Sequence, residues 1–202
     1  MKCYLVRHGQ TEWNQSHRFQ GWLDIGLDQI GILQSQMLAR YFSQIPIDYI
    51  FSSDLSRALK TAQQINQKLD CRMTLSSGLR EMNVGNWEGK TWEEIEVEFK
   101  DDLNQDDAQL FGLTISGGES LLGFQKRVVE TFMRIIEKHP NNELLIVTHG
   151  GVIRVLLCHL LGYDLSQRDL LKVENGSITT LDVLDKNHIE IVAQNIIKHL
   201  SS

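Results

Sequence analysis

Short apolar runs alternate along the chain with longer stretches in which apolar residues recur every three or four positions. The runs at residues 3–6, 49–51 and 144–147 are apolar throughout and short enough for buried strands, and residues 72–75 form a weaker candidate. Helical spacing occurs between the runs, in three groups of apolar positions: Ile30, Leu33, Met37, Leu38 and Tyr41; Ala58, Ala62, Ile65 and Leu69; and Leu121, Phe124, Val128, Phe132, Ile135 and Ile136. This alternation predicts parallel strands joined by right-handed helical crossovers.

Turn and capping residues mark the limits of the predicted helices. Pro46 and Pro140 end two of them. Asp54 is the expected N-cap of the helix that carries Ala58 to Leu69, and Thr91 with Glu94 has the form of a capping box at the start of another helix.

The last third of the chain has a different pattern. After a helix rich in Val, Ile and Leu that follows Gly151, residues 178–184 and 189–196 alternate between apolar and polar side chains, which predicts two strands joined near Asp185. We therefore expect an α/β fold of three layers, αβα, with a mostly parallel central sheet. The chain has no repeat and no proline-rich or glycine–serine linker, so residues 1–202 are expected to form a single domain.

Composition narrows the class of protein without revealing its chemistry. The 202 residues are 42% hydrophobic and 23% charged, which is ordinary for a globular protein, and the formal net charge is −6. An acidic chain is a poor general binder of nucleic acid or anionic membranes, although this average does not constrain one pocket. The three cysteines, at 3, 71 and 158, suit neither a disulfide framework nor a zinc knuckle, and with no signal peptide or spanning segment evident we expect a cytoplasmic protein.

Chemically useful side chains follow each of the predicted parallel strands. In sheets of this kind the carboxyl ends of the strands face the ligand site. The residues that follow the four strands are, in order, Arg7, His8 and Gly9; Ser52, Ser53 and Arg57; Arg80 and Glu81; and Thr148, His149 and Gly150. Two imidazoles, several guanidiniums and one carboxylate are therefore expected at one edge of the sheet.

This set of groups suits phosphoryl chemistry. Guanidinium groups and the N–H groups at helix N-termini bind phosphate oxygens. Neutral imidazole is a competent nucleophile near pH 7, and an imidazolium stabilises the transferring group, so His8 and His149 indicate more than binding. Glu81 is the expected proton donor to the leaving alcohol, provided that burial raises its pKa. The residues alone do not decide which histidine is attacked.

Several motifs resemble those of the histidine phosphatase superfamily, which includes the cofactor-dependent phosphoglycerate mutases. The resemblance begins with LVRHGQTEWN at residues 5–14 and continues through RFQGWLDIGL, FSSDLSRALKTA, LREMNVGNWEG, SGGES and VTHGGVIR. These motifs are spread in order over nearly the whole chain. They imply a phosphoglycerate mutase-like fold, a phosphohistidine intermediate, no metal and no cofactor.

The resemblance also implies roles for individual residues. His8 is similar to the phosphoryl-accepting nucleophile of the family, and Arg7, Arg57 and His149 to its phosphate pocket. Glu81 corresponds to the acid and base. Further contacts are implied for four residues: Asn14, Gln20, Gly21 and the backbone of Gly150. We expect a protonated His149 in this mechanism.

Three alternative kinds of site, for nucleotide binding, ester hydrolysis and metal binding, are disfavoured because their motifs are incomplete. Residues 85–91 resemble a Walker A loop, but Val84 stands where the first glycine is needed. His149-Gly150-Gly151 is similar to an esterase oxyanion loop, but the chain has no G-x-S-x-G elbow. The seven histidines do not have the spacing of a metal site.

Within the superfamily, two features favour transfer of the phosphoryl group to water over transfer within the substrate. Residues 93–107 are rich in acidic side chains and contain a single lysine, whereas the mutases are longer and have basic and tyrosine residues there. Gln20 stands where mutases usually have a smaller hydroxyl residue. We therefore expect a metal-independent phosphomonoesterase for a small phosphorylated metabolite, with a phosphoglycerate mutase or a non-catalytic phosphometabolite sensor as the alternatives.

The sequence leaves the substrate, the oligomeric state and some pocket residues open. Phosphoserine, α-ribazole phosphate, sugar or glycolytic phosphates and protein phosphohistidine are all candidates, and the protein is expected to be a monomer or a homodimer. Trp22 and Trp87 are the better candidates for the pocket wall, and Trp92 for helix packing. His199 belongs either to a segment near the pocket or to a frayed tail.

Overall fold

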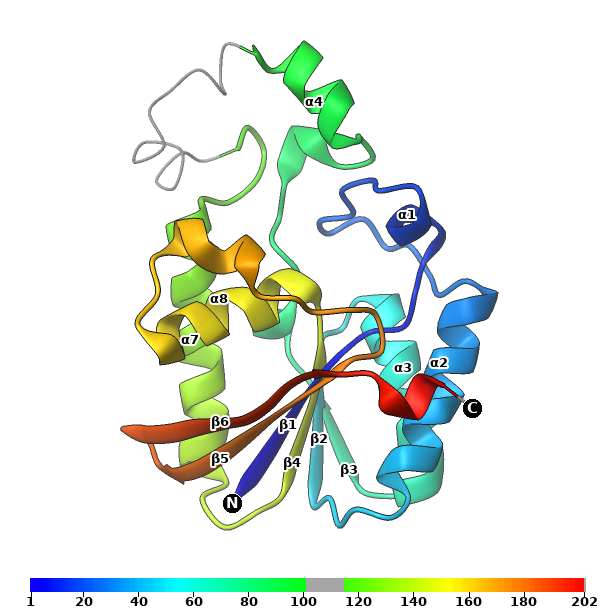
Figure 1. Ribbon diagram of the computed structural model, residues 1–202, viewed down its shortest axis with the longest axis vertical. Helices are drawn as coiled ribbons and strands as arrows, with labels where there is room; N and C mark the ends of the chain where they lie inside the picture. Colours follow the sequence, from blue (N-terminus) through cyan, green and yellow to red (C-terminus); the bar gives the residue numbers. More distant parts are fainter. Residues whose placement is uncertain (101–114, 202) are drawn as a thin grey trace.

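The central sheet has six strands in the order β3-β2-β4-β1-β5-β6 (Figure 1). The computed structural model describes residues 1–100 and 115–201. Its strands are β1 (Lys2–Arg7), β2 (Tyr49–Ser52), β3 (Arg72–Leu75), β4 (Leu144–Thr148), β5 (Ile178–Asp185) and β6 (His188–Ile196). The first four run parallel, β5 is antiparallel to β1, and β6 is antiparallel to β5. The prediction of a mostly parallel sheet is confirmed.

Helices cover both faces of this sheet, as expected for three layers (Figure 1). The α-helices are α1 (Glu12–Gln15), α2 (Gln29–Phe42), α3 (Ser56–Leu69), α4 (Trp92–Glu98), α7 (Leu121–Lys138) and α8 (Gly150–Leu161), and the short 3₁₀ helices are η1 (Ser77–Leu79), η2 (Gly85–Trp87), η3 (Leu165–Leu170) and η4 (Lys198–Leu200). Helices α2 and α3 lie on one face, whereas α7 and α8 lie on the other. None of the helices in the described ranges is long and apolar enough to span a membrane.

The apolar runs in the sequence correspond to strands that are buried on both sides. In β1, Cys3 and Leu5 pack with the apolar residues of α7 and α8, while Tyr4 and Val6 pack with those of α2 and α3. The side chains of β4 also alternate between the two faces of the sheet, and the strand is buried along its whole length. A strand that is covered on both faces needs apolar residues at every position, which explains the unbroken runs.

One of the two predicted helix caps is present and one is wrong. Thr91 begins α4 with a full capping box, in which its hydroxyl accepts from the backbone of Glu94. Asp54 does not cap α3, whose N-cap position is Leu55. Its carboxylate instead accepts hydrogen bonds from Arg80 Nε at 2.7 Å and Nη2 at 2.5 Å. The side chain therefore ties the end of β2 to the segment after β3.

Candidate active site

Backbone hydrogen bonds hold the residues after three parallel strands together. The His8 N–H donates to the Thr148 carbonyl at 2.9 Å, and the Ser53 N–H donates to the Val147 carbonyl at 3.0 Å. These bonds extend the β1–β4 and β2–β4 pairing by one residue beyond the strands. As a result the rings of His8 and His149 lie with their centroids 5.1 Å apart. The predicted convergence of the two imidazoles is confirmed.

The geometry of His8 determines which of its nitrogens is available. Nδ1 lies 2.7 Å from the Gly9 carbonyl oxygen. Because a carbonyl oxygen only accepts, Nδ1 carries the proton and Nε2 has the free lone pair. Burial, followed by the charges of Arg57 and Arg7, holds the pKa of His8 well below 6.5. The ring is therefore neutral, as a nucleophile must be.

The hydrogen bonds of His149 are also those of a neutral ring, so the imidazolium expected in the mechanism stays a prediction. Its Nδ1 accepts a hydrogen bond from Arg57 Nε at 3.3 Å, so its Nε2 carries the proton and donates to Ser53 Oγ at 2.8 Å. Burial, followed by the charge of Arg57, lowers the pKa of His149 well below 6.5. A cationic His149 would have to give up its bond with Arg57, because both groups would then be donors.

The two arginines differ in how their hydrogen-bonding capacity is used. Arg57, at 1% exposure, donates to His149 and, through its two terminal nitrogens, to the carbonyls of Leu23 at 2.9 Å and Gly21 at 2.8 Å. Arg7 donates to the Val173 carbonyl at 2.7 Å, but its Nε is buried and has no partner within the described part of the chain. Burial lowers the pKa of Arg7 to about 10. Both guanidiniums are charged at neutral pH, and Arg7 has a donor available for an anion.

Glu81 lies at the N-terminus of α8, next to the histidines. One carboxylate oxygen accepts from the Met82 N–H at 2.9 Å and the other from the Gly151 N–H at 3.1 Å. The absence of a side chain at Gly151 leaves room for this carboxylate, because a Cβ there would lie 2.2 Å from Glu81 Oε1. Two backbone donors and a glycine thus place the predicted acid at the site.

The predicted binding residues lie around the same point. Asn14 Oδ1 accepts from the Thr11 N–H, the Thr11 hydroxyl and the Asn175 amide, all at 3.1 Å, which leaves the Asn14 NH₂ group to face the cavity. Gln20 is buried, and its Oε1 has no partner within residues 1–100 and 115–201. Gly21 adopts a positive φ of 51° against Glu88, and Gly150 is the first residue of α8.

Asn14, Gln20 and Gly21 line one end of a cavity of about 580 Å³, whereas Gly150 and His149 are not among its lining residues. Arg7, His8 and Arg57 form its deep end, and Glu81 lines it beside them. Trp87 lines the cavity as predicted, whereas the prediction for Trp92 is wrong, since it also lines the cavity and is 44% exposed. Trp22 is not among the lining residues; its indole N–H donates to the Glu81 carbonyl at 2.8 Å.

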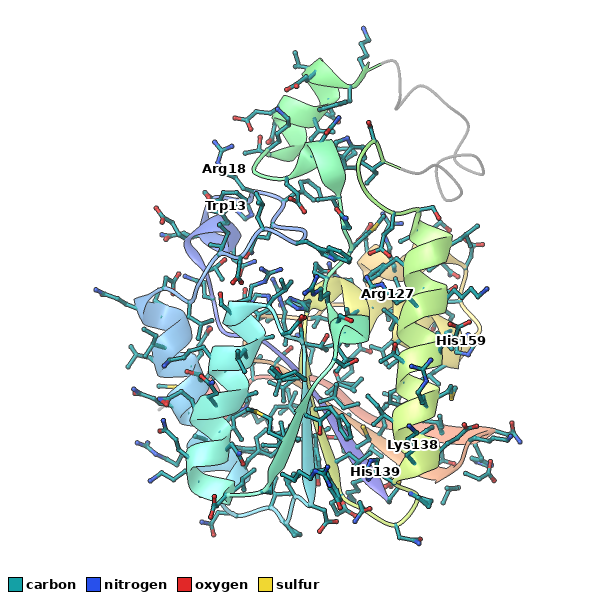
Figure 2. All side chains as sticks on the ribbon, turned by 180° about the vertical axis from the view of Figure 1, so that it is seen from behind. Trp13, Arg18, Arg127, Lys138, His139 and His159 are labelled. Carbon is teal, nitrogen blue, oxygen red and sulfur yellow. The ribbon has the colours of Figure 1, made fainter. Side chains whose placement is uncertain are left out.

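Three residues near the site are not predicted from the sequence: two lie outside the motifs, and Arg154 ends the VTHGGVIR motif. Asn175, in the loop before β5, donates to the His8 carbonyl at 3.2 Å as well as to Asn14. Arg127 on α7 donates to the carbonyls of Gly78, Arg80 and Glu81 and pairs with Glu119 at 2.6 Å. Figure 2 shows Arg127 on α7, between the level of Trp13 and Arg18 and that of His139. Arg154 lines the cavity and is near enough to Arg7 to lower its pKa.

Metal ligation has no candidate in this region. Within the described ranges, no group of three or more His, Cys, Asp or Glu side chains is placed to hold a metal ion.

Comparisons with known proteins identify the family of this chain. The model of the histidine phosphatase superfamily, branch 1, matches residues 3–197. Phosphoserine phosphatase 1 of Hydrogenobacter thermophilus is 30% identical, over 99% of this chain and 94% of its own. Phosphoglycerate mutase-like protein 4 of Arabidopsis thaliana is 34% identical, over 97% of this chain and 85% of its own.

Solved structures give the same result. An Entamoeba histolytica phosphoserine phosphatase mutant in complex with phosphoserine has a TM-score of 0.86 at 31% identity and covers 98% of both chains. The α-ribazole phosphatase of Shigella flexneri has a TM-score of 0.88 at 25% identity, with 97% of this chain and 96% of that chain covered. The relatives thus include phosphatases of several monoesters and mutase-like proteins.

Proposed function

The chain belongs to branch 1 of the histidine phosphatase superfamily, and from this premise we propose that it is a metal-independent phosphomonoesterase acting on a small phosphorylated metabolite. The observation that carries the proposal is the state of His8. Its Nδ1 is bonded to Gly9, its Nε2 lone pair is free, and its pKa is lowered by burial beside Arg57 and Arg7. A neutral imidazole next to two guanidiniums is suited to attack a phosphoryl group.

In the first half-reaction, His8 Nε2 attacks phosphorus in line with the ester oxygen. The N–P bond forms as the ester O–P bond breaks, and the leaving alkoxide takes a proton from Glu81. Arg7, Arg57 and His149 stabilise the charge on the three equatorial oxygens, with the Asn14 amide and the Gly150 N–H as further donors. The products are the free alcohol and phosphohistidine.

In the second half-reaction, water replaces the alcohol. Glu81, now a carboxylate, removes a proton from the water, whose oxygen attacks phosphorus while the N–P bond breaks. Orthophosphate leaves, and His8 and Glu81 return to their starting protonation states. Glu81 can serve both halves because the alcohol and the water occupy the same side of the phosphoryl group.

Two features of the pocket opening support transfer to water. Arg18, which lines the cavity, is paired with Glu94 at 2.8 Å, and Lys90 is paired with Glu98 at 2.6 Å. Like charges on α4 would repel a second phosphate of the substrate. Residues 101–107 of the acidic stretch lie outside the described residues. Gln20 is buried at the site, in place of the hydroxyl residue usual in mutases.

The test is release of inorganic phosphate from a panel of monoesters in the presence of EDTA, with phosphoserine and α-ribazole phosphate included. We expect release by the parent protein, none by His8→Ala, and full activity of His159→Gln, a histidine exposed on α8. Interconversion of 3- and 2-phosphoglycerate without net phosphate release would establish the mutase instead. Acid-labile phosphate trapped on the parent protein, but not on His8→Ala, would exclude a catalytically silent sensor.

A further inference from the structure

The outer part of the cavity has different chemistry from its phosphate-binding end. Its volume of about 580 Å³ lies within the range of about 300–1,000 Å³ in which proteins bind drug-sized ligands. A phosphoryl group at Arg7 and Arg57 fills only the deep end. The remaining space is available to the alcohol part of the ester.

One wall of this outer part is a cluster of three aromatic rings from separate segments. The centroid of Phe19 lies 6.1 Å from that of Trp87 and 6.4 Å from that of Trp92, and the two indoles are 6.1 Å apart. Backbone bonds fix the cluster, since the Phe19 N–H donates to the Lys90 carbonyl at 2.9 Å and its carbonyl accepts from the Gly89 N–H at 2.8 Å. The Trp92 indole N–H is held by Glu96 at 2.7 Å. These rings form a fixed apolar surface.

Other parts of the wall are apolar as well. Met82, Val84, Leu121, Phe124 and Val155 line the cavity, and four of these five are buried. Three further arginines line the cavity: two lie against acids, and Arg154 donates to the Leu171 carbonyl at 3.0 Å. Arg18 lies against Glu94 at 2.8 Å, and Arg168 lies 3.4 Å from Asp169. A carboxylate on the substrate would have to compete with these acids.

We propose that the ester cleaved here is one whose alcohol has a bulky apolar body, aromatic or branched, held between the Phe19–Trp87–Trp92 cluster and the wall at Val155. The proposal rests on the proposed phosphomonoesterase function. It assigns the three rings a role in substrate selection: they favour a large apolar alcohol over the small, charged alcohols released from phosphoserine or phosphoglycerate. Release of an apolar body from water provides the preference.

The test compares 2-phenylethyl phosphate with ethyl phosphate, because both release a primary alcohol of similar acidity. We expect kcat/KM to be at least about 10-fold higher for the phenylethyl ester, and higher than for phosphoserine. Trp92→Ala should lower kcat/KM for the phenylethyl ester about 3- to 10-fold and leave that for ethyl phosphate unchanged. Tyr163→Ala is the matched control, since Tyr163 is an aromatic residue of similar exposure (43% against 44%) that does not line the cavity.

Binding to His8→Ala separates this inference from the proposed function. Calorimetry should give a Kd for 2-phenylethyl phosphate at least about 10-fold below that for ethyl phosphate, whether or not the parent protein releases phosphate. Equal Kd values, or tighter binding of phosphoserine, would overturn the inference about the alcohol. Preferential binding without phosphate release from any ester would overturn the proposed function alone.

Discussion

Both ring nitrogens of His149 are engaged by protein groups, and this decides its charge. Arg57 donates to Nδ1, and Ser53 accepts from Nε2. A bound phosphoryl group offers acceptor oxygens to Arg57 and to His149 at once. Protonation of His149 is then compatible with the site only if Arg57 turns toward the phosphate, so the charge of this ring is coupled to substrate binding.

The buried neutral histidines predict a loss of stability in acid. Their pKa values are far below 6.5 in the folded protein and near 6.5 in the unfolded chain, so below pH 6.5 the unfolded state binds protons that the folded state does not. The free energy of unfolding should therefore fall with falling pH by up to about 1.4 kcal/mol per pH unit for each histidine. Urea unfolding between pH 7.5 and 5 measures this slope.

His149→Asn should reduce the slope of unfolding free energy against pH by the contribution of one histidine, because it removes one of the two titrating rings. His159→Gln, at an exposed position of α8, is the control and should leave the slope unchanged. An unaltered slope in His149→Asn would show that the ring does not stay neutral in the folded protein.

The loss of activity on replacing Glu81 is expected to be larger for esters with poorer leaving groups. Glu81→Gln keeps the size of the side chain but cannot protonate an alkoxide. We expect kcat/KM, which reports the first half-reaction, to fall by about 10²- to 10⁴-fold for an alkyl phosphate and much less for p-nitrophenyl phosphate, whose phenolate leaves without help. Glu130→Gln, in an exposed ion pair on α7, should leave both unchanged. Equal losses on the two esters would remove Glu81 from the acid role.

Asn175 is expected to act through Asn14. Its amide donates to Asn14 Oδ1 and the His8 carbonyl, whereas the carboxylate of Asn175→Asp would face two acceptors. We expect about a 10-fold loss in kcat/KM, mostly in KM, because the Asn14 NH₂ group is no longer held toward the phosphate.

A double-mutant cycle checks this dependence. In the Asn14→Ala background, Asn175→Asp should cost less than about 2-fold in kcat/KM, because residues that share one network are not additive. Asn187→Asp, in the exposed turn between β5 and β6, is the control. Full additivity would mean that Asn175 acts independently of Asn14.

At the scale of elements, the sequence predicts what is buried more reliably than what is paired. Apolar runs are sufficient to predict β1, β2 and β4, because these strands are covered on both faces, and alternation predicts β5 and β6 at the half-covered side. Strand β3 has only a weak signal because its residues are largely exposed at the sheet edge. The cap at Asp54 is wrong because Arg80, 26 residues away, is a stronger partner than the α3 backbone.

In the first turn of α8, replacing Gly151 by alanine is expected to reduce activity more than it reduces stability. Alanine is the better helix former, but a Cβ at position 151 would lie 2.2 Å from Glu81 Oε1 and displace the carboxylate. Gly151→Ala should lower kcat/KM on alkyl phosphates by about 10-fold or more. Gly123→Ala on α7, where the nearest neighbour of a Cβ is Ser120 Oγ at 3.1 Å, is the control and should retain activity. Full activity of Gly151→Ala would mean that Glu81 does not need its present position.

At the scale of the whole molecule, local arrangement overrides average composition. A net charge of −6 gives no indication of anion binding, yet the half-buried Arg7 and the buried Arg57 line one cavity at the carboxyl ends of the strands. Motif residues predict His8, His149, Glu81 and their neighbours, since each follows a strand. Asn175 is not predictable in this way, because its partners lie more than 160 residues away in the sequence.

The C-terminal segment provides the last prediction, because it supports the loop that holds His8. Gly176 donates from its N–H to the carbonyls of Arg7 and His8 at 3.1 and 3.2 Å, and its own carbonyl lies 3.0 Å from His199 Nε2. Leu200 packs on Gly176, and the His199 ring lies 5.2 Å from that of Tyr41 on α2. His199 is thus neither at the cavity nor in a frayed tail.

The double variant His199→Ala/Leu200→Ala should therefore lower stability by about 1–3 kcal/mol and also weaken binding of inorganic phosphate. Urea unfolding and competitive inhibition by phosphate measure the two effects. Ser201→Ala, at an exposed position, is the control for both. If stability falls while phosphate binding is unchanged, η4 supports the fold alone, because a loosened Gly176 loop would release the backbone of Arg7 and His8 together.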